Sequence, residues 1–408
     1  MSRIAPPALS IRAAFCLVLA GVCAALHIWK LPPALPALQI ELGLDLVESG
    51  FLLSIVQFGG MTLGLLVGLV AERIGLRRCV LIGLAILAAA SVAGAYFDTI
   101  AMIMLFRALE GCGFLMVAMP VPSLIRQLVP PGRLNRIMTL WSCYMPAGSV
   151  LILLAGPWLL RLGDWRMLWI FLAVLTVAML YLVWAMVPSD AQRARQQSTQ
   201  RPHSEAVRPS ILHMVRLTLS SRDVWIIALI FGAYAAQWVA LIGFLPTIYA
   251  AAGIQGTTAG FLTALVAGVN IIGNLLAGRL LHRGLTARRL IVTGLCTMMV
   301  CTFLSFGAGL PMPIQFAAIL VFSAVGGLIP ATLFVLAIRV APSPQTTTTT
   351  VGWMQQCSSL GQFVGPPVIA WVVDLAGGWQ WTWLATGAYA LAGILLALSL
   401  SRRAEPSA

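Results

Sequence analysis

The sequence predicts an all-α membrane protein whose twelve transmembrane helices form two pseudo-symmetric six-helix bundles. Of its 408 residues, 60% are hydrophobic and only 9% are charged, whereas a soluble domain carries about 25% charged residues. The mean hydropathy of the chain is +0.96. Twelve apolar runs approach the roughly 20 residues that are needed to cross a bilayer, and the two halves of the chain repeat one another. A soluble fold is excluded, because the chain has too little polar surface to cover a folded particle.

The apolar runs follow one another with short polar connections, except for a longer polar stretch between the sixth and the seventh. The first run follows Arg3 and Arg12 and so imitates a signal peptide. It lacks a small-residue cleavage site and more runs follow it, so we treat it as a retained first helix. The expected spans are residues 13–36, 46–69, 78–97, 99–127, 135–161, 165–187, 223–250, 258–281, 288–309, 313–339, 347–373 and 380–400.

Basic residues indicate which side of the membrane each connection faces. Arginine provides 24 of the 25 basic residues, and Lys30 is the single lysine. With both termini in the cytoplasm, 21 basic residues fall in inner segments, and only Lys30, Arg161 and Arg166 fall in outer segments. Arg107 lies inside the membrane. The positive-inside rule therefore predicts a multi-pass protein of a bacterial inner membrane with both termini in the cytoplasm.

Residues 188–222 are polar, rich in Arg, Gln and Ser, and contain Pro202 and Pro209. This composition predicts a cytoplasmic linker between an N-terminal six-helix bundle, residues 1–187, and a C-terminal one, residues 223–408, which ends in a short cytoplasmic tail. Within the linker, residues 211–219 form either a short amphipathic helix on the inner leaflet, with His213 and Arg216 facing the headgroups, or a plain connection.

The two halves share an ordered series of residues at one offset, which indicates an internal repeat. The pairs at an offset of 210 residues are Pro36 with Pro246, Gly50 with Gly260, Gly68 with Gly278, Arg73 with Arg283 and Arg78 with Arg288. Parallel repeats of this kind build transporters whose solute site lies between the halves.

A short charged connection, GLVAERIGLRR, joins the second and third runs. It resembles the loop signature that joins the second and third transmembrane helices in the major facilitator superfamily. The resemblance implies a loop that gates the cytoplasmic opening, the alternative being a solvated basic loop. Its residues are Gly68, Glu72, Arg73, Gly75, Arg77 and Arg78, and its counterpart in the second half contains Gly278, Arg283, Arg288 and Arg289.

The fourth run carries charges inside the membrane. Arg107, Gly111 and Gly113 resemble the superfamily's fourth-helix motif, R-x-x-x-G-x-G, in which the arginine is linked to proton transfer. Glu110 stands where the family more often has glutamine, three residues after Arg107, so the two side chains can pair on one helix face. A carboxylate in this low-dielectric setting can take up a proton near neutral pH. We therefore expect the pair to couple transport to protons, the alternative being a fixed ion pair that holds the helix.

His27 lies deep in the first run, next to Trp29. Histidine exchanges protons near physiological pH, so His27 is the third expected proton-coupling residue. The alternative is a histidine that is hydrogen-bonded for structural reasons.

Glycine–proline pairs lie in the fifth and eleventh runs. Gly156 and Pro157 resemble in part a motif of exporters in the superfamily, although the trailing glycines of that motif are replaced in this chain. Gly365 and Pro366 form a second copy at an offset of 209 residues. The resemblance implies helix bends that favour export. Packing alone accounts for the residues equally well, because small residues allow helices to approach closely.

Other polar and aromatic residues in the runs are expected either to line a substrate cavity or to pack between helices. They are Gln57, Tyr144, Tyr234, Gln237, Trp238, Asn270, Asn274, Gln355 and Gln356. The eight cysteines lack metal-ligand spacing, and the chain has no phosphate-binding loop and no catalytic constellation. No metal, cofactor or enzymatic activity is therefore expected. The first run has no carboxylate, which disfavours a strongly cationic solute and leaves neutral, zwitterionic and anionic molecules.

These observations predict a proton-coupled secondary transporter that exports a drug-like compound or a secreted metabolite such as a siderophore. One alternative is an uptake permease for a small anion, because Phe244–Thr247 and Leu360–Pro367 resemble the cyanate and nitrate branch of the superfamily. The other is a non-transporting membrane sensor, which would usually carry an appended soluble domain, whereas only Ala404–Ala408 follow the last arginine. The expected partners are the lipid bilayer, a small-molecule solute and protons, without nucleic acid, and the expected state is a monomer.

Overall fold

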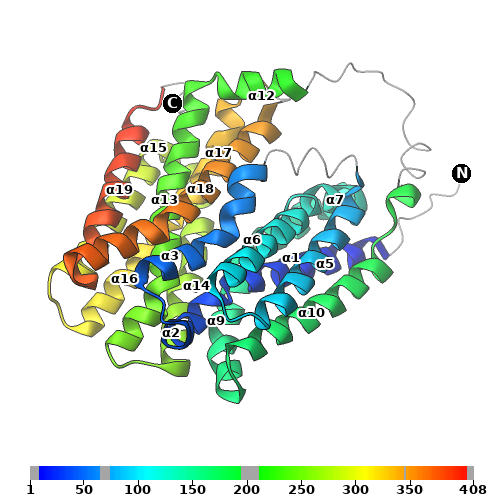
Figure 1. Cartoon of the computed structure of the whole chain (residues 1–408). Coiled ribbons are helices and arrows are strands. Elements are labelled where there is room, and N and C mark those ends of the chain that lie inside the picture. Colours follow the sequence, from blue (N-terminus) through cyan, green and yellow to red (C-terminus); the bar gives the residue numbers. More distant parts are fainter. Residues whose placement is uncertain (1–8, 65–73, 194–210, 344–345, 402–408) are drawn as a thin grey trace, which may run out of the picture. The chain divides into compact units, whose positions relative to one another are not determined.

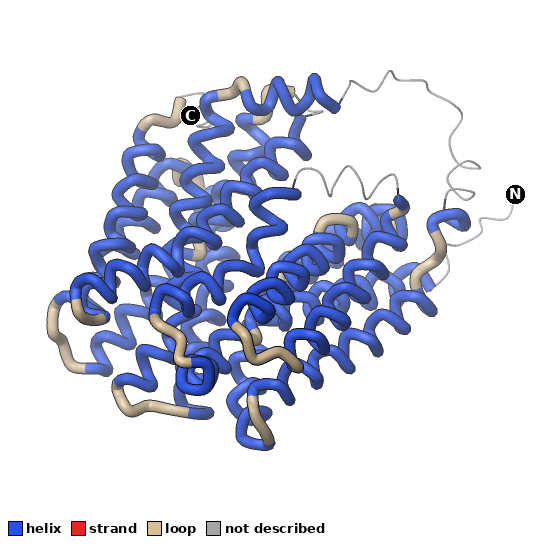
Figure 2. The backbone as a smooth tube through the Cα atoms, viewed as in Figure 1, coloured by secondary structure: helices blue, strands red, loops and turns tan. Residues whose placement is uncertain are grey.

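The computed structural model describes residues 9–64, 74–193, 211–343 and 346–401 of the chain. These residues form helices joined by short turns, and no strand occurs among them (Figure 1; Figure 2). Twelve helical stretches in the described ranges are long and apolar enough to cross a membrane. The predicted all-α fold with twelve spans is therefore confirmed. The first span, which reaches Leu42, and the sixth, which reaches Arg193, extend furthest beyond the predicted limits.

Contacts divide the chain into two compact units. Unit 1 comprises residues 1–30, 66–152 and 159–208, and unit 2 comprises residues 31–65, 153–158 and 209–408. These units differ from the predicted bundles in two segments, 31–65 and 153–158, which group with residues of the second half. The division of the chain at a 188–222 linker stays a prediction.

Unit 1 is built around α5 and α6, which pack against each other, while α1 packs against both and α10 packs against α5 and α1. A Cβ atom at Gly83 of α5 would lie 2.7 Å from the carbonyl oxygen of Gly113 of α6, so only glycine permits this approach. Gly113 belongs to the fourth-helix motif, so one glycine of that motif allows α6 to pack closely against α5. The helices of unit 1 are α1 (Leu9–Trp29), α5 (Leu76–Ala95), α6 (Ile100–Ala118), α7 (Val121–Leu128), α8 (Pro131–Ser142), most of α9 (Tyr144–Leu162) and α10 (Trp165–Met186).

Unit 2 contains the helices of the second half together with two short helices that follow α1 in the chain. Its first elements are α2 (Leu31–Leu42), α3 (Leu46–Ser54) and the 3₁₀ turn η1 (Ile55–Gln57). Its remaining elements are α12 (Ile211–Leu219), α13 (Arg222–Ala251), α14 (Gly256–His282), α15 (Ala287–Thr302), the π-helical turn η2 (Phe303–Gly307), α16 (Met312–Gly326), α17 (Leu328–Val340), α18 (Thr347–Ala376), the 3₁₀ turn η4 (Trp379–Trp381) and α19 (Thr382–Leu398).

The core of unit 2 is the pair α13 and α18, and α3 packs against α18. A Cβ atom at Gly50 of α3 would lie 2.8 Å from the Cα atom of Pro367, so the two backbones are in direct contact. The side chain of Gln356 adds a hydrogen bond of 2.7 Å to the carbonyl of Met61. The segment 46–64 is thereby joined to α18 by backbone packing and by a polar contact.

Residues 211–219 form the helix α12, the first of the two alternatives for this segment. His213 and Arg216 are exposed, whereas Thr218 is buried and its hydroxyl lies 2.7 Å from that of Thr349. α12 therefore contacts α18 through one face and presents its basic side chains on another.

Candidate functional site

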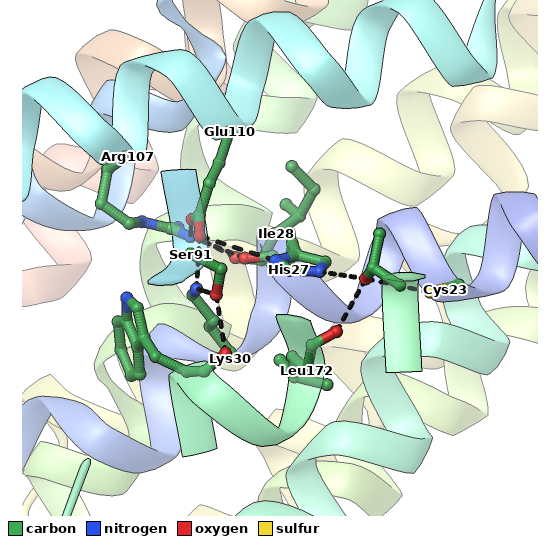
Figure 3. Close-up of polar contacts among 10 residues, drawn as sticks. Cys23, His27, Ile28, Lys30, Ser91, Arg107, Glu110 and Leu172 are labelled. Carbon is green, nitrogen blue, oxygen red and sulfur yellow. Dashed lines mark hydrogen bonds and ion pairs between the residues drawn. The ribbon is translucent and has the colours of Figure 1, made fainter. Parts of the chain in front are cut away.

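A cluster of charged side chains lies in the interior of unit 1, where α1, α5, α6 and α10 pack together (Figure 3). Its charged members are His27 and Lys30 at the end of α1 and Arg107 and Glu110 on α6. Each of the four is at most 1% exposed. Burial of this kind is costly for charged groups, so such groups are normally paired.

The end of α1 is where Arg107 enters the cluster. Pro32 has no N–H to donate, so the helical hydrogen bond that would reach the carbonyl of Ile28 is missing. Arg107 Nη2 donates to this carbonyl at 3.2 Å, and Nη1 donates to the carbonyl of His27 at 2.6 Å. Nη1 also donates to Glu110 Oε2 at 2.8 Å. Arg107 and Glu110 therefore pair as their spacing predicts, and the same guanidinium caps α1.

Lys30 does not lie in an exposed outer connection, contrary to the prediction from the charge count. Its ammonium forms an ion pair with Glu110 Oε1, donates to Ser91 Oγ at 2.8 Å and lies 4.2 Å from the centre of the Trp169 ring. Ser91 in turn donates to the carbonyl of Trp169 at 2.8 Å. The count of basic residues along the chain misses these partners, because they belong to three other helices. The available signal was a single lysine two residues before Pro32 in a chain that otherwise uses arginine.

His27 has one nitrogen in a hydrogen bond and the other beside the carboxylate. Its Nε2 lies 2.7 Å from Thr176 Oγ1, and the Thr176 hydroxyl donates to the carbonyl of Leu172 at 2.7 Å. Because the hydroxyl proton is already used, Thr176 accepts, and His27 Nε2 carries the hydrogen in this assignment. Among the described residues His27 Nδ1 has no hydrogen-bond partner, and it lies 3.5 Å from Glu110 Oε1. The cluster therefore contains a vacant position for one proton, between an imidazole nitrogen and a carboxylate.

The cluster contains more positive than negative charge. Lys30 and Arg107 provide two positive charges, and Glu110 provides the negative charge that balances one of them. His27 adds a further positive charge when it is protonated. The remaining contacts of the cluster, through Ser91 and Thr176, are uncharged. Such a site can hold a proton, an anion or both.

The described part of the predicted gating loop lies at the start of α5. Gly75 precedes the helix at φ 104°, and Asp190 accepts hydrogen bonds from the backbone N–H groups of Arg77 and Arg78 at 3.1 and 3.2 Å. Asp190 also pairs with Arg193. Gly68, Glu72 and Arg73 lie outside the described residues.

Asp190, the acid that binds the free N–H groups at the start of α5, is not among the residues expected from the sequence. Its only signal is its position directly after the sixth apolar run. A Cβ atom at Gly75 would lie 2.5 Å from its carboxylate oxygen. The loop and the end of the sixth span are therefore in direct contact.

The counterpart loop in unit 2 makes a related contact. Arg288 Nη2 donates to the carbonyl of Leu400 at 2.8 Å, and the same offset of 210 residues relates this pair to Arg78 and Asp190. The other predicted residues lie in or next to the flanking helices: Gly278 in α14, Arg283 at its end and Arg289 in the first turn of α15. The internal repeat thus extends to contacts at the start of the third and the ninth spans.

An uncharged polar network in unit 2 contains four of the predicted cavity residues. Asn270 donates to the hydroxyl of Tyr234 at 3.0 Å and to the carbonyl of Ser323 at 2.9 Å, and Asn274 donates to Asn270 Oδ1 at 2.9 Å. Trp238 Nε1 donates to Ser323 Oγ at 3.0 Å. The residues that were expected to bind solute or to join helices are therefore brought together, and their contacts join α13, α14 and α16.

The remaining predicted cavity residues are dispersed. Gln237 is buried on α13, and its Oε1 has no hydrogen-bond partner within the residues that the structure describes, while Gln57 is buried in η1. Gln355 is half-buried on α18, beside the Gln356 that binds Met61. Tyr144 lies in unit 1, stacked on Trp141 with 4.3 Å between ring centres.

The glycine–proline pairs lie within continuous helices and make close contacts. A Cβ atom at Gly156 would lie 2.9 Å from Pro33 Cγ, and one at Gly260 would lie 2.5 Å from Pro157 Cγ. Gly365 approaches the carbonyl of Ala236 in the same way. Pro366 also lies inside α18. Packing of small residues accounts for all these positions.

The chain was compared with known families and structures. Its sequence matches the profile of the Major Facilitator Superfamily over residues 17–355 and 231–408. The chain belongs to this superfamily. No curated protein in the comparison matches it.

Solved structures of major facilitator proteins share the fold. A bacterial homologue of the human lysosomal transporter Spinster, inward-facing and occupied, has 16% identity and a TM-score of 0.81, over 97% of this chain and 98% of that chain. A structure of such a homologue in the inward-facing and unoccupied conformation has 14% identity and a TM-score of 0.76, over 98% and 96%. A D-xylose–proton symporter has 16% identity and a TM-score of 0.74, over 96% and 97%.

As a member of the major facilitator superfamily, the protein is a secondary transporter and not an enzyme. Its twelve spans make it a multi-pass membrane protein. The buried cluster of unit 1 lies on the first and fourth of these spans, with Ser91 on the third and Thr176 on the sixth.

Proposed function

We propose that this major facilitator protein is a proton-coupled transporter of a small organic solute in a bacterial inner membrane, and that His27 and Glu110 hold the transported proton. The observation that carries the proposal is that His27 Nδ1 lies 3.5 Å from Glu110 Oε1 and has no hydrogen-bond partner in the described part of the chain. Both side chains are at most 1% exposed, so a proton between them is shielded from bulk water. Arg107, the third expected coupling residue, contacts Glu110 and holds the end of α1.

The transported proton binds between His27 Nδ1 and Glu110 Oε1. The hydrogen on His27 Nε2 is engaged with Thr176, so an additional proton binds at Nδ1 or on the carboxylate of Glu110. A proton on the carboxylate removes the charge of Glu110, whereas a proton at Nδ1 gives Glu110 Oε1 a second cationic partner beside Lys30. In both cases the ion pair between Lys30 and Glu110 weakens. Loading and release of the proton therefore alter the contact between α1 and α6, as alternating access requires.

Two directions of transport remain as proposals. Export of a drug-like compound or of a siderophore-like metabolite rests on the exporter resemblance of Gly156 and Pro157. Uptake of a small anion together with a proton is favoured by the excess of positive charge around Glu110. A D-xylose–proton symporter with the same fold shows that the fold is compatible with symport. The cytoplasmic position of both termini is part of the same proposal.

The experiment that tests proton coupling is solute-driven proton movement in proteoliposomes that contain a pH-sensitive dye. In a symporter an added solute acidifies the lumen, and in an antiporter it makes the lumen more alkaline, so the sign also gives the relation between solute and proton. We expect His27→Gln and Glu110→Gln to lose this proton movement while solute binding remains. His213→Gln, which changes an exposed histidine on α12, is the matched control. Unchanged coupling in both His27→Gln and Glu110→Gln would exclude the cluster as the proton site.

A further inference from the structure

The charge balance of the buried cluster restricts the solute. The titratable groups that face Glu110 are His27 and Lys30 from α1 and Arg107 from α6. The cluster's contacts on α5 and α10 are uncharged and come from Ser91, Trp169 and Thr176 in the described part of the chain. With neutral His27, the cluster holds two positive charges and one negative charge. The transported proton adds one more positive charge, whichever atom binds it.

Excess charge in the membrane interior is unfavourable unless a partner of opposite sign is present. No second acid of the described ranges reaches the cluster, so proton loading alone increases the excess of positive charge that already exists there. A negatively charged group on the solute removes this imbalance. Proton and anion therefore favour each other's binding through their charges, which is a coupling free energy between two ligands.

We infer that the transported solute is a small organic anion, such as a carboxylate, whose negative group replaces Glu110 on the Lys30 ammonium when the cluster holds the transported proton. This inference rests on the proposed proton-coupled function. No covalent bond is made or broken. The proton enters from the solution on the loading side and leaves on the other side together with the anion, so the cluster returns to its Lys30–Glu110 ion pair.

Contacts that do not involve Glu110 keep the two cations in position for this exchange. The Lys30 ammonium retains its hydrogen bond to Ser91 Oγ and its place over the Trp169 ring. Arg107 retains its hydrogen bonds to the carbonyls of His27 and Ile28. The cation site is therefore formed by α1, α5, α6 and α10 without the carboxylate, and Glu110 occupies it in the present structure.

Lys30 provides a direct test, because it is the single lysine of the chain. The full-length protein in detergent is treated at fixed pH with a small isothiocyanate that reacts with amines. Peptide masses separate the labelled Lys30 from the labelled N-terminus. We expect Lys30 to be labelled about tenfold faster in Glu110→Gln than in the wild type. A tenfold change corresponds to the loss of about 1.4 kcal/mol of interaction free energy between Lys30 and Glu110. Asp98→Asn removes an acid from the exposed ion pair with Arg166 and is the matched control, with labelling as in the wild type.

The same assay then identifies the chemistry of the solute. Benzoate and succinate are compared with their uncharged amides for protection of Lys30 in Glu110→Gln. Protection by an acid and not by its amide supports the inference. Equal protection by acid and amide, or wild-type labelling in Glu110→Gln, overturns it.

A second measurement needs no variant and distinguishes this inference from the proposed function. In weakly buffered solution, binding of benzoate or succinate to the wild type is expected to take up protons, whereas the amides cause no uptake. If proteoliposomes couple a neutral solute to protons and Lys30→Gln retains this coupling, the proposed function stands and the anion site is refuted. If acids protect Lys30 but no solute moves protons, the anion site stands and the proposed function fails.

Discussion

The carboxylate of Glu110 on α6 forms an ion pair with the ammonium of Lys30 at the end of α1, and neither residue is more than 1% exposed. The pair joins two spans that lie 80 residues apart in the chain. We predict that Glu110→Gln destabilises the protein by about 3–5 kcal/mol, since it leaves the buried cations Lys30 and Arg107 without an acid. Lys30→Gln is expected to destabilise it less, because Glu110 keeps its ion pair with Arg107.

The variant with both substitutions is expected to lose less stability than the sum of the two single variants, because it leaves no unpaired member of this pair. Thermal unfolding in detergent measures the stability of the two single variants and of the double variant. Additive losses would show that the contact contributes no coupling energy.

Arg107→Ala is predicted to abolish transport, but not because Glu110 becomes unpaired. Glu110 retains Lys30 and His27, whereas the carbonyls of His27 and Ile28 lose their donors. Arg107→Lys is expected to rescue transport poorly, since a single ammonium does not reproduce the fork of Nη1 and Nη2. Uptake or efflux assays measure the transport activity of both variants, normalised to the amount of each protein in the membrane. Full activity of Arg107→Lys would show that charge alone is required.

Gly75→Leu is predicted to reduce transport strongly while the protein still reaches the membrane. Gly75 has a φ of 104°, and a Cβ atom would lie 2.5 Å from the Asp190 carboxylate. Backbone strain of this type costs about 1–3 kcal/mol, and the clash also displaces Asp190 from the start of α5. Gly284→Leu is the matched control, because Gly284 has a φ of 87° and no atom of the described residues lies within 4 Å of an added Cβ. Equal losses in both variants would attribute the effect to backbone strain and not to Asp190.

Gly50→Val is predicted to lower both the thermal midpoint and transport, since its side chain would displace α3 from the backbone of Pro366 and Pro367 on α18. Gly278→Val, on α14 with no atom within 4 Å of the added Cβ, tests the helix-propensity cost of the same substitution. Comparison of the unfolding temperatures and transport rates of the two variants separates the effect of the clash from the effect of helix propensity. A Gly50→Val protein as stable as Gly278→Val would mean that α3 is not held by this contact.

The predicted orientation is open to a direct test with reporter fusions. Fusions after Ser198 and Ala404 are expected to report a cytoplasmic position, and a fusion after Gly253 an external one, because 21 of the basic residues fall on one side. A cytoplasmic reporter at Gly253 would reverse the orientation and the direction of proton loading.

Much of the fold follows from the sequence, because hydrophobic length and charge position act along the chain. Twelve apolar runs give twelve spans, and the limits of the second half differ by only a few residues from those in the structure. The pairing of Arg107 with Glu110 also follows from the sequence, since a spacing of three residues within a helix fixes which side chains meet.

The tertiary structure decided which helices share their charged and polar side chains. The partners of Lys30 lie on α5, α6 and α10, and Asp190 meets α5 from the end of the sixth span. The hydrogen bond of His27 Nε2 to Thr176, which lies 149 residues away in the chain, determines that Nδ1 is the nitrogen that faces Glu110. No periodicity or spacing encodes such contacts, because the free energy of burying a charge depends on the groups that packing brings around it and not on its neighbours in the chain.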